Sequence, residues 1–203
     1  MIFLLNTPTD KVTVQNTIYM KELSLNILDI VENSIKAGAD LIKITLIEDG
    51  DKLTVAVYDN GSGMDDKVLK TALCSSAEPD FKGGGGMGIP LFKKTAERTG
   101  GSFGIKSKVA DNQSSEHGTV VTAVLFKSSP DFKNLGNIPD TVEAIIAGNP
   151  EGDLIFSHKS QNGEVFLNTK ELRKVLKDVP LNNCEVLSWI KTYLEKLYRV
   201  FNA

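Results

Sequence analysis

The chain has 203 residues, of which 41% are hydrophobic, 24% charged and 7% aromatic, an average globular composition that excludes disordered, fibrous and coiled-coil proteins. Its 23 basic and 26 acidic residues give a net charge of −3, and neither half of the chain is basic. Nucleic-acid binding depends on clustered lysines and arginines, so we expect no nucleic-acid partner.

The cysteines and the apolar segments bear on where the protein resides. Cys74 and Cys184 lie far apart in sequence, outside any cysteine or histidine cluster, which predicts neither a disulfide framework nor a zinc site. The run Ile2–Leu5 is too short for a signal sequence, and no stretch approaches the ~20 apolar residues of a membrane span. We therefore expect a cytoplasmic protein with no membrane partner.

Residues 1–19 are expected to form an N-terminal arm ahead of the regular pattern. From Glu22 to Ala37 the apolar residues recur at intervals of three and four, which predicts a mostly buried helix that ends at Gly38. Residues 41–47 and 53–58 then alternate around a polar glycine turn, which predicts a β-hairpin.

The stretch after Met64 is expected to be an irregular lid that extends over residues 65–86. A helix is predicted over residues 88–99, followed by strands over residues 102–107 and 118–126. The order helix, hairpin, lid, helix, hairpin predicts an α+β fold, a two-layer sandwich with its helices on one face of the sheet. We assign this domain to residues 20–127.

A change of composition at residues 128–130 is expected to mark a domain boundary, and residues 128–203 are expected to form a small C-terminal α/β domain. The predicted elements are a helix over 140–147, a hairpin over 154–167, a helix over 172–179 with a capping box at Asn168, and a last helix from residue 186. The apolar stripe of the last helix is expected to pack on the hairpin, with an oligomer or partner face as the alternative.

Four short segments carry the chemistry, and the first lies on the first predicted helix. Asp29 and Asn33 are four residues apart, so their side chains project from one face and can converge on one ligand. The amide oxygen of Asn33 suits a magnesium ion that bridges phosphate oxygens. Lys36, one turn further on, can add a positive charge to those phosphates. The solvated face of an amphipathic helix is the alternative for this segment alone.

The second and third segments are rich in glycine. The second is Asp59-Asn-Gly61-Ser-Gly63-Met64, where a carboxylate at a strand end can accept a hydrogen bond from an exocyclic amine and the glycines let the backbone approach a planar ring. An ordinary turn is the alternative. The third consists of Gly84, Gly85, Gly86, Met87 and Gly88. This run leads into a helix N-terminus, and its backbone N–H groups can wrap anionic oxygens. A flexible linker is the alternative.

Together with Gly118-Thr119 before a strand, these segments resemble, in order and spacing, the sequence boxes of the GHKL family. The resemblance covers roughly residues 22–126. It implies the Bergerat-type ATP-binding fold that gyrase B, the large heat-shock chaperone ATPases, sensor histidine kinases and mismatch-repair MutL share. It implies ATP and Mg2+ as ligands, with Asn33 on the metal, Asp59 reading adenine and Thr119 closing the pocket. The tail from Lys127 onward does not resemble the domains that accompany this fold in gyrase or MutL.

Members of the family differ at the position of Asp29. Many members have a glutamate there, which acts as general base, whereas sensor histidine kinases usually have an asparagine. The resemblance therefore implies that Asp29 is the catalytic base, with a side chain one methylene shorter and slow turnover, and leaves Glu32 as the alternative base. The stretch from Gly86 to Thr119, in contrast, reads closely like the catalytic domain of a sensor kinase.

Two hypotheses about function follow. The first is slow ATP hydrolysis or phosphoryl transfer to a protein hydroxyl. The second is a non-catalytic, nucleotide-gated interaction switch, similar to an anti-sigma-factor regulator, in which ATP orders the lid and a protein partner reads it. Both expect ATP or ADP as ligand and a protein partner of unknown identity, with a homodimer as an open alternative. We assign no catalytic role to His117 or His158.

Overall fold

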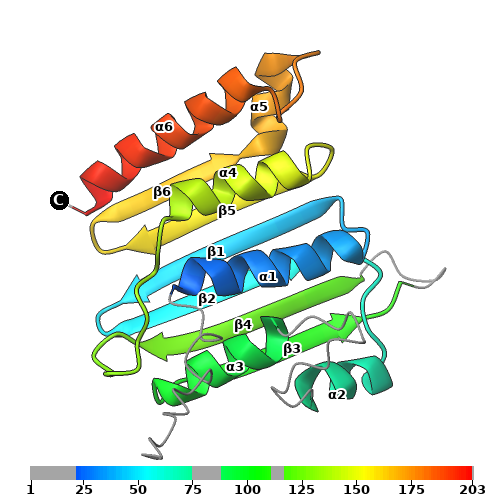
Figure 1. Cartoon of the computed structure of the whole chain (residues 1–203), viewed down its shortest axis with the longest axis vertical. Coiled ribbons are helices and arrows are strands. Elements are labelled where there is room, and N and C mark those ends of the chain that lie inside the picture. Colours follow the sequence, from blue (N-terminus) through cyan, green and yellow to red (C-terminus); the bar gives the residue numbers. More distant parts are fainter. Residues whose placement is uncertain (1–21, 75–87, 111–116, 203) are drawn as a thin grey trace, which may run out of the picture.

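The computed structural model describes residues 22–74, 88–110 and 117–202, which form one six-stranded sheet with helices on one face (Figure 1). The elements are α1 (Leu23–Lys36), β1 (Leu41–Asp49), β2 (Lys52–Asp59), α2 (Asp66–Cys74), α3 (Gly88–Arg98), β3 (Ser102–Lys108), β4 (Gly118–Phe126), α4 (Ile138–Gly148), β5 (Asp153–Ser160), β6 (Gly163–Asn168), α5 (Thr169–Leu176) and α6 (Cys184–Phe201). The predicted α+β sandwich is confirmed.

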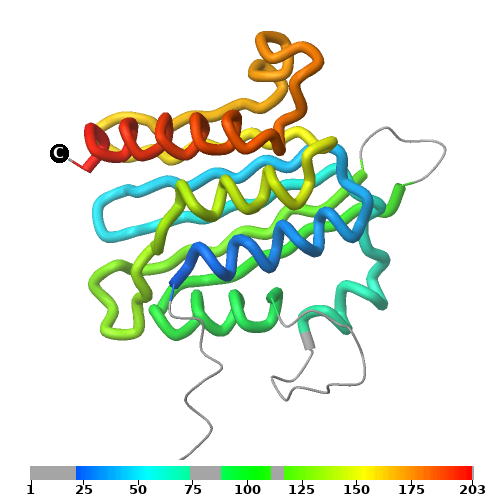
Figure 2. The backbone as a smooth tube through the Cα atoms, turned by 45° about the horizontal axis from the view of Figure 1, so that its top comes forward, coloured from blue at the N-terminus to red at the C-terminus, as the bar shows by residue number. Residues whose placement is uncertain are grey.

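The strands are arranged in the order β3-β4-β2-β1-β5-β6. β1 and β5 are parallel, and the other neighbouring pairs are antiparallel. α1 lies in the middle of the helical layer, between α3 and α4, as the tube view shows (Figure 2). Alternate strand residues such as Ile42, Ile44 and Leu46 face this layer and are at most 2% exposed, so the core lies between the sheet and the helices.

The first helix and hairpin form where the residue pattern predicts them. Leu23, Ile27 and Val31 give α1 a buried stripe, and Gly38 follows with a φ of 74°, a left-handed conformation that favours glycine. Ser34 also lies on the buried side of α1, at 3% exposure. Because this polar side chain faces the core, it must find a hydrogen-bond partner there.

The prediction of an irregular stretch after Met64 is wrong for residues 66–74, which form α2. The carboxylate of Asp65 caps this helix by accepting a hydrogen bond from the backbone N–H of Val68 at 2.8 Å. Ala72 and Leu73 pack against the core from the inner side of the helix. The helix is short and carries few apolar residues, so its periodicity is weak, and its capping aspartate is the signal that was missed.

The strands of the C-terminal segment extend the same sheet. β5 pairs with β1 from Asp153 opposite Leu41 to Lys159 opposite Ile47, and β6 returns antiparallel to β5. α4 packs between α1 and α6, and buried side chains from both segments form one continuous core. The two segments therefore share one sheet and one core. The domain boundary at residue 128 stays a prediction.

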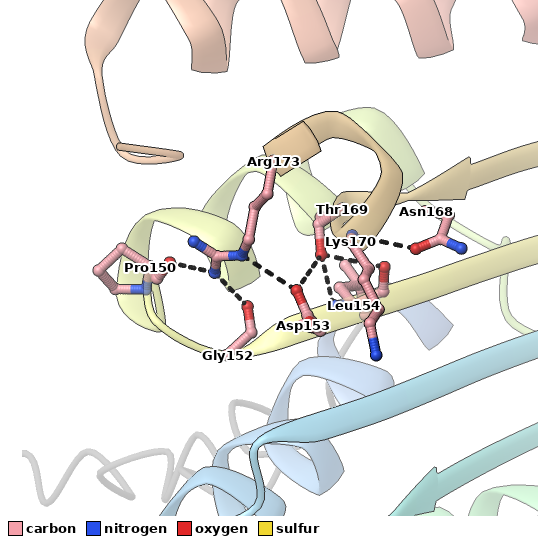
Figure 3. A network of polar contacts seen from close by, with 8 residues as sticks. All are labelled: Pro150, Gly152, Asp153, Leu154, Asn168, Thr169, Lys170 and Arg173. Carbon is pink, nitrogen blue, oxygen red and sulfur yellow. Dashed lines mark hydrogen bonds and ion pairs between the residues drawn. The ribbon is translucent and has the colours of Figure 1, made fainter. Parts of the chain in front are cut away.

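Arg173 joins α5 to the loop before β5 (Figure 3). Its Nε donates to Oδ1 of Asp153 at 3.0 Å, and its Nη2 donates to the carbonyl oxygens of Pro150 at 2.6 Å and Gly152 at 2.9 Å. The fully buried Thr169 accepts the backbone N–H of Leu154 with its hydroxyl. These contacts satisfy loop groups that would otherwise lack partners and fix the start of β5.

A group of titratable side chains gathers around the buried His158, at the end of the sheet remote from Asp59. His158, 1% exposed, is hydrogen-bonded through Nε2 to Glu48 at 3.1 Å and through Nδ1 to the Tyr198 hydroxyl at 2.9 Å. The second carboxylate oxygen of Glu48 accepts from Lys127 at 2.7 Å. This cluster therefore joins β1 and the end of β4 to β5 and α6.

We expect the stability of the protein to fall as the solution becomes acidic because of this cluster. Burial lowers the pKa of His158 below its ordinary value of 6.5, and Glu48 only partly offsets this effect. The unfolded chain therefore binds more protons than the folded one between the ordinary pKa and the lowered pKa of the folded protein, so the free energy of unfolding by urea decreases as the pH falls through 6.5 toward that lowered pKa. The decrease is expected to be smaller in His158→Gln, and equal decreases would remove His158 as its cause.

Candidate functional site

A cavity of about 650 Å³ opens between α1, α2 and the ends of β2 and β4. This volume lies within the range of small-molecule sites, which are mostly apolar with a few polar groups that orient the ligand. The residues that line it are Ile30, Asn33, Ser34, Ala37, Asp59, Gly63, Met64, Asp65, Lys67, Val68, Thr71, Ala72, Ile89, Thr119 and Val121.

Asp59 is the buried acidic group of this cavity, at 5% exposure. Its Oδ2 accepts a hydrogen bond from the Ser34 hydroxyl at 2.8 Å. Its Oδ1 accepts the backbone N–H groups of Gly61 at 2.9 Å and Thr119 at 3.3 Å. These donors, from α1, the loop after β2 and β4, hold the carboxylate in a fixed orientation, ready to receive an N–H donor from a ligand.

The loop after β2 passes so close to its neighbours that side chains are excluded at two positions. A Cβ at Gly61 would lie 2.9 Å from the Ala37 carbonyl oxygen, and a Cβ at Gly63 would lie 2.0 Å from the Lys108 carbonyl oxygen. Gly63 also has a φ of 69°, which disfavours any other residue. The glycines thus bring this backbone between α1 and β3, at the wall of the cavity.

A second set of hydrogen bonds joins the loop to β3 and to the start of β4. The Ser107 hydroxyl accepts the backbone N–H of Met64 at 2.7 Å and lies 2.9 Å from the Thr119 hydroxyl. His117 also contributes, because its Nδ1 lies 2.7 Å from the carbonyl oxygen of Gly61. These contacts fix the position of Met64 and Thr119, two predicted residues that line the cavity.

The predicted residues of α1 take three different positions. Asn33 is half-buried and lines the cavity. Asp29, one turn earlier, lies against the start of α3, where a Cβ at Gly88 would come within 2.7 Å of its own Cβ. Lys36 is exposed and forms an ion pair with Glu32 at 3.6 Å. Neither Asp29 nor Lys36 is among the residues that line the cavity.

Asp29 is placed in an environment that favours its neutral form. Burial raises the pKa of this carboxyl above its ordinary value of 3.8, the charge of Glu32 raises it further, and Lys36 opposes both effects. A carboxylate with a raised pKa is a better proton acceptor near neutral pH. This direction of shift agrees with the predicted role of Asp29 as a general base, which stays a prediction.

Of the predicted site residues in the described ranges, the structure brings five to the cavity wall: Asn33, Asp59, Gly63, Met64 and Thr119. Gly61 contacts Asp59, and Gly88 contacts Asp29, at the edges of the same region. The other members of the predicted glycine run, Gly84, Gly85, Gly86 and Met87, lie outside the described residues.

Several functional residues were missed by the sequence analysis. Ser34 is the main one, since among the described residues it is the only one whose side chain donates a hydrogen bond to Asp59, and a lone serine on the apolar stripe of α1 was its signal. Ser107 and His117 support the loop from β3 and from the residue before β4, and no local pattern marks them. The α2 residues of the wall, including Lys67 and Thr71, were hidden by the missed helix.

The described part of the cavity offers few groups that could hold a metal ion. Within the described ranges no three His, Cys, Asp or Glu side chains gather in a way that would hold a metal ion. Asn33 alone provides an amide oxygen at the cavity wall on the α1 side. A single neutral oxygen matches Mg2+, which keeps several waters and is bound mainly through substrate phosphates.

The fold and this site define the class of protein. Residues 21–129 match the family model of the histidine kinase-, DNA gyrase B- and HSP90-like ATPases, which is more than half of the chain. The chain belongs to this family, and the resemblance to GHKL proteins predicted from its sequence boxes is confirmed.

Relatives and solved structures of this family include DNA mismatch repair proteins. MutL from two strains of Listeria monocytogenes is 27% identical over 183 residues, which cover 73% of this chain but only 30% of that protein. The Aquifex aeolicus MutL ATPase domain complexed with ADP matches with a TM-score of 0.50 at 11% identity, covering 90% of this chain and 98% of that one. The N-terminal domain of a DNA repair protein matches with a TM-score of 0.51 at 14% identity, over 74% and 53% of the two chains.

The two structural matches show the shared fold. This chain spans less than a third of the length of the MutL proteins that it matches. In the ranges that the structure describes, no helix combines the length and the apolar character needed to cross a membrane.

Proposed function

We propose that this protein binds ATP together with Mg2+ in the cavity between α1 and α2 and turns it over slowly, by hydrolysis or by phosphoryl transfer to a protein hydroxyl. The observation that carries this proposal is the buried Asp59 carboxylate, held by three donors at a glycine loop in a cavity of nucleotide size. The family to which the chain belongs supports the nucleotide.

The residues have separate roles in this proposal. Asp59 accepts a hydrogen bond from the exocyclic amine of adenine, and apolar wall residues such as Ile30 and Val121 contact the ring. Asn33 holds Mg2+, which when bound neutralises charge on the phosphates. Asp29 accepts the proton of the attacking water or hydroxyl, and Thr119 closes the pocket beside Asp59.

A competing function is a nucleotide-gated switch without relevant turnover, and one observation favours it. Asp29 lies beside the cavity wall and against α3, instead of lining the cavity itself. If this carboxylate cannot reach the attacking group, the nucleotide is bound and not consumed. A protein partner would then respond to the bound state.

A phosphate-release assay separates the two functions. We expect the protein to release inorganic phosphate from ATP slowly with Mg2+ present, and to stop when the metal is chelated. Measurement of ATP binding on the same sample supplies the control. Binding without phosphate release, and without transfer of labelled phosphate to added protein, would support the switch, and the absence of ATP binding would contradict both functions.

A further inference from the structure

The sheet face opposite the helices, which we name the open face, plays no part in the nucleotide site. The helices α1, α3, α4 and α6 all lie on the other side of the sheet (Figures 1 and 2). The register of the strands places the open-face side chains in rows. One row comprises Lys106, Val120, Tyr58, Lys43 and Ile155, and another comprises Val124, Thr54, Ile47 and Lys159.

Apolar side chains are accessible on several strands of this face. Ile47 on β1 is 42% exposed, Phe126 on β4 is 37% exposed and Phe166 on β6 is 45% exposed. Half-buried residues such as Val124 and Ile155 lie among the same rows. Exposed apolar side chains on several strands of an uncovered sheet face are typical of contact with another polypeptide.

The charge of the open face is opposite in sign to that of the whole chain. The net charge of the chain is −3, whereas this face carries Lys43, Lys52, Lys106, Lys108 and Lys159. Its acidic side chains are fewer: Glu164 is paired with Lys159, Asp153 is paired with Arg173, and Asp49 lies at the end of β1.

Three of these lysines form no ion pair within the described ranges, although Lys52 lies opposite Asp49 in the register of β1 and β2. None of the ion pairs between described residues involves Lys43, Lys52 or Lys106. The ammonium of Lys43 lies 5.1 Å from the ring centre of Tyr58. Tyr58 precedes Asp59 in β2, so the two side chains lie on opposite faces of the sheet. The face therefore combines an excess of positive charge with apolar contact area.

We propose that the open face docks an acidic segment of a partner protein, with glutamates or aspartates of the partner opposite Lys43, Lys52 and Lys106. Apolar side chains of that segment would cover Ile47 and Phe126. A second copy of this chain fits less well, because two open faces in contact would place lysines opposite lysines. This proposal does not depend on turnover of ATP.

The test uses the full-length protein and a short fluorescein-labelled peptide in which glutamates alternate with apolar residues, followed by fluorescence anisotropy. We expect Lys43→Glu combined with Lys106→Glu to weaken binding of this peptide at least about tenfold. The matched control, Lys170→Glu combined with Lys196→Glu, makes the same charge change on α5 and α6. It is expected to keep binding within about twofold.

The other outcomes overturn the proposal. No binding of the peptide, equal losses in both double variants, or equal binding of a peptide with glutamine in place of glutamate would each show that the face is not an acidic-segment site. Sedimentation with vesicles of anionic lipid that depends on Lys43 would assign the face to a membrane, and a dimer dissociated by Lys43→Glu would assign it to a second copy. Unchanged ATP affinity in the variants keeps a failure here distinct from a failure of the nucleotide proposal.

Discussion

The variant Asp29→Asn is expected to keep its affinity for Mg-ATP within severalfold of the parent protein while its turnover falls by about 100-fold or more. Asparagine has nearly the same size as aspartate, so the contact between residue 29 and Gly88 at the start of α3 is kept. Only the ability to accept a proton is lost. Phosphate release under saturating ATP and calorimetric titration of a non-hydrolysable analogue measure the two quantities separately.

Glu32→Gln is the matched control for this prediction. Glu32 is three residues further along α1, exposed and paired with Lys36, and the sequence leaves it as the alternative base. Its removal is expected to leave turnover within a few-fold of the parent, since it acts on Asp29 only through charge. If Glu32→Gln lost turnover and Asp29→Asn kept it, the roles would be reversed, and if both kept it, the switch function would be favoured.

Asp59→Asn is expected to weaken ATP and ADP by the same factor, because both nucleotides carry the same base. A charge-assisted hydrogen bond contributes ~1.5–3 kcal/mol, which corresponds to a loss of about 10- to 150-fold in affinity. Loss of one acceptor oxygen also disturbs the bonds from Ser34, Gly61 and Thr119. Competition with a fluorescent ATP analogue gives both affinities.

The control removes the same charge elsewhere. Asp49→Asn, at the exposed end of β1, is expected to leave both affinities unchanged. Circular dichroism of Asp59→Asn checks that the protein remains folded, and Ser34→Ala gives a milder version of the same defect by removing one supporting bond. Unchanged ADP affinity in a folded Asp59→Asn protein would show that this carboxylate does not read the base.

Much of the fold follows from local patterns in the sequence. The three-to-four spacing of Leu23, Ile27 and Val31 defines α1, and alternation around an Asp-Gly turn defines the first hairpin. Helix α2 was missed, because a short helix with few apolar residues has little periodicity. The parallel pairing of β5 with β1 was also missed, since residues more than 100 positions apart meet through tertiary packing that no local pattern encodes.

The candidate site was predictable at the residues that stand in short sequence motifs. Asp59, Asn33 and Gly63 stand in motifs whose chemistry can be read directly, and the structure brings all three to the cavity. The supporting hydrogen bonds were not predictable. Ser107 reaches Met64 from a strand 43 residues away, and Ser34 reaches Asp59 from 25 residues away, so their roles depend on strand register and helix packing.

A crystal structure of the full chain with Mg2+ and a non-hydrolysable ATP analogue tests the central claim most directly. We predict adenine in the cavity between α1 and α2, with its exocyclic amine within about 3.2 Å of an Asp59 carboxylate oxygen and Mg2+ on the amide oxygen of Asn33. A nucleotide bound elsewhere, or a cavity that stays empty at saturating analogue, would contradict the assignment of this cavity as the ATP site.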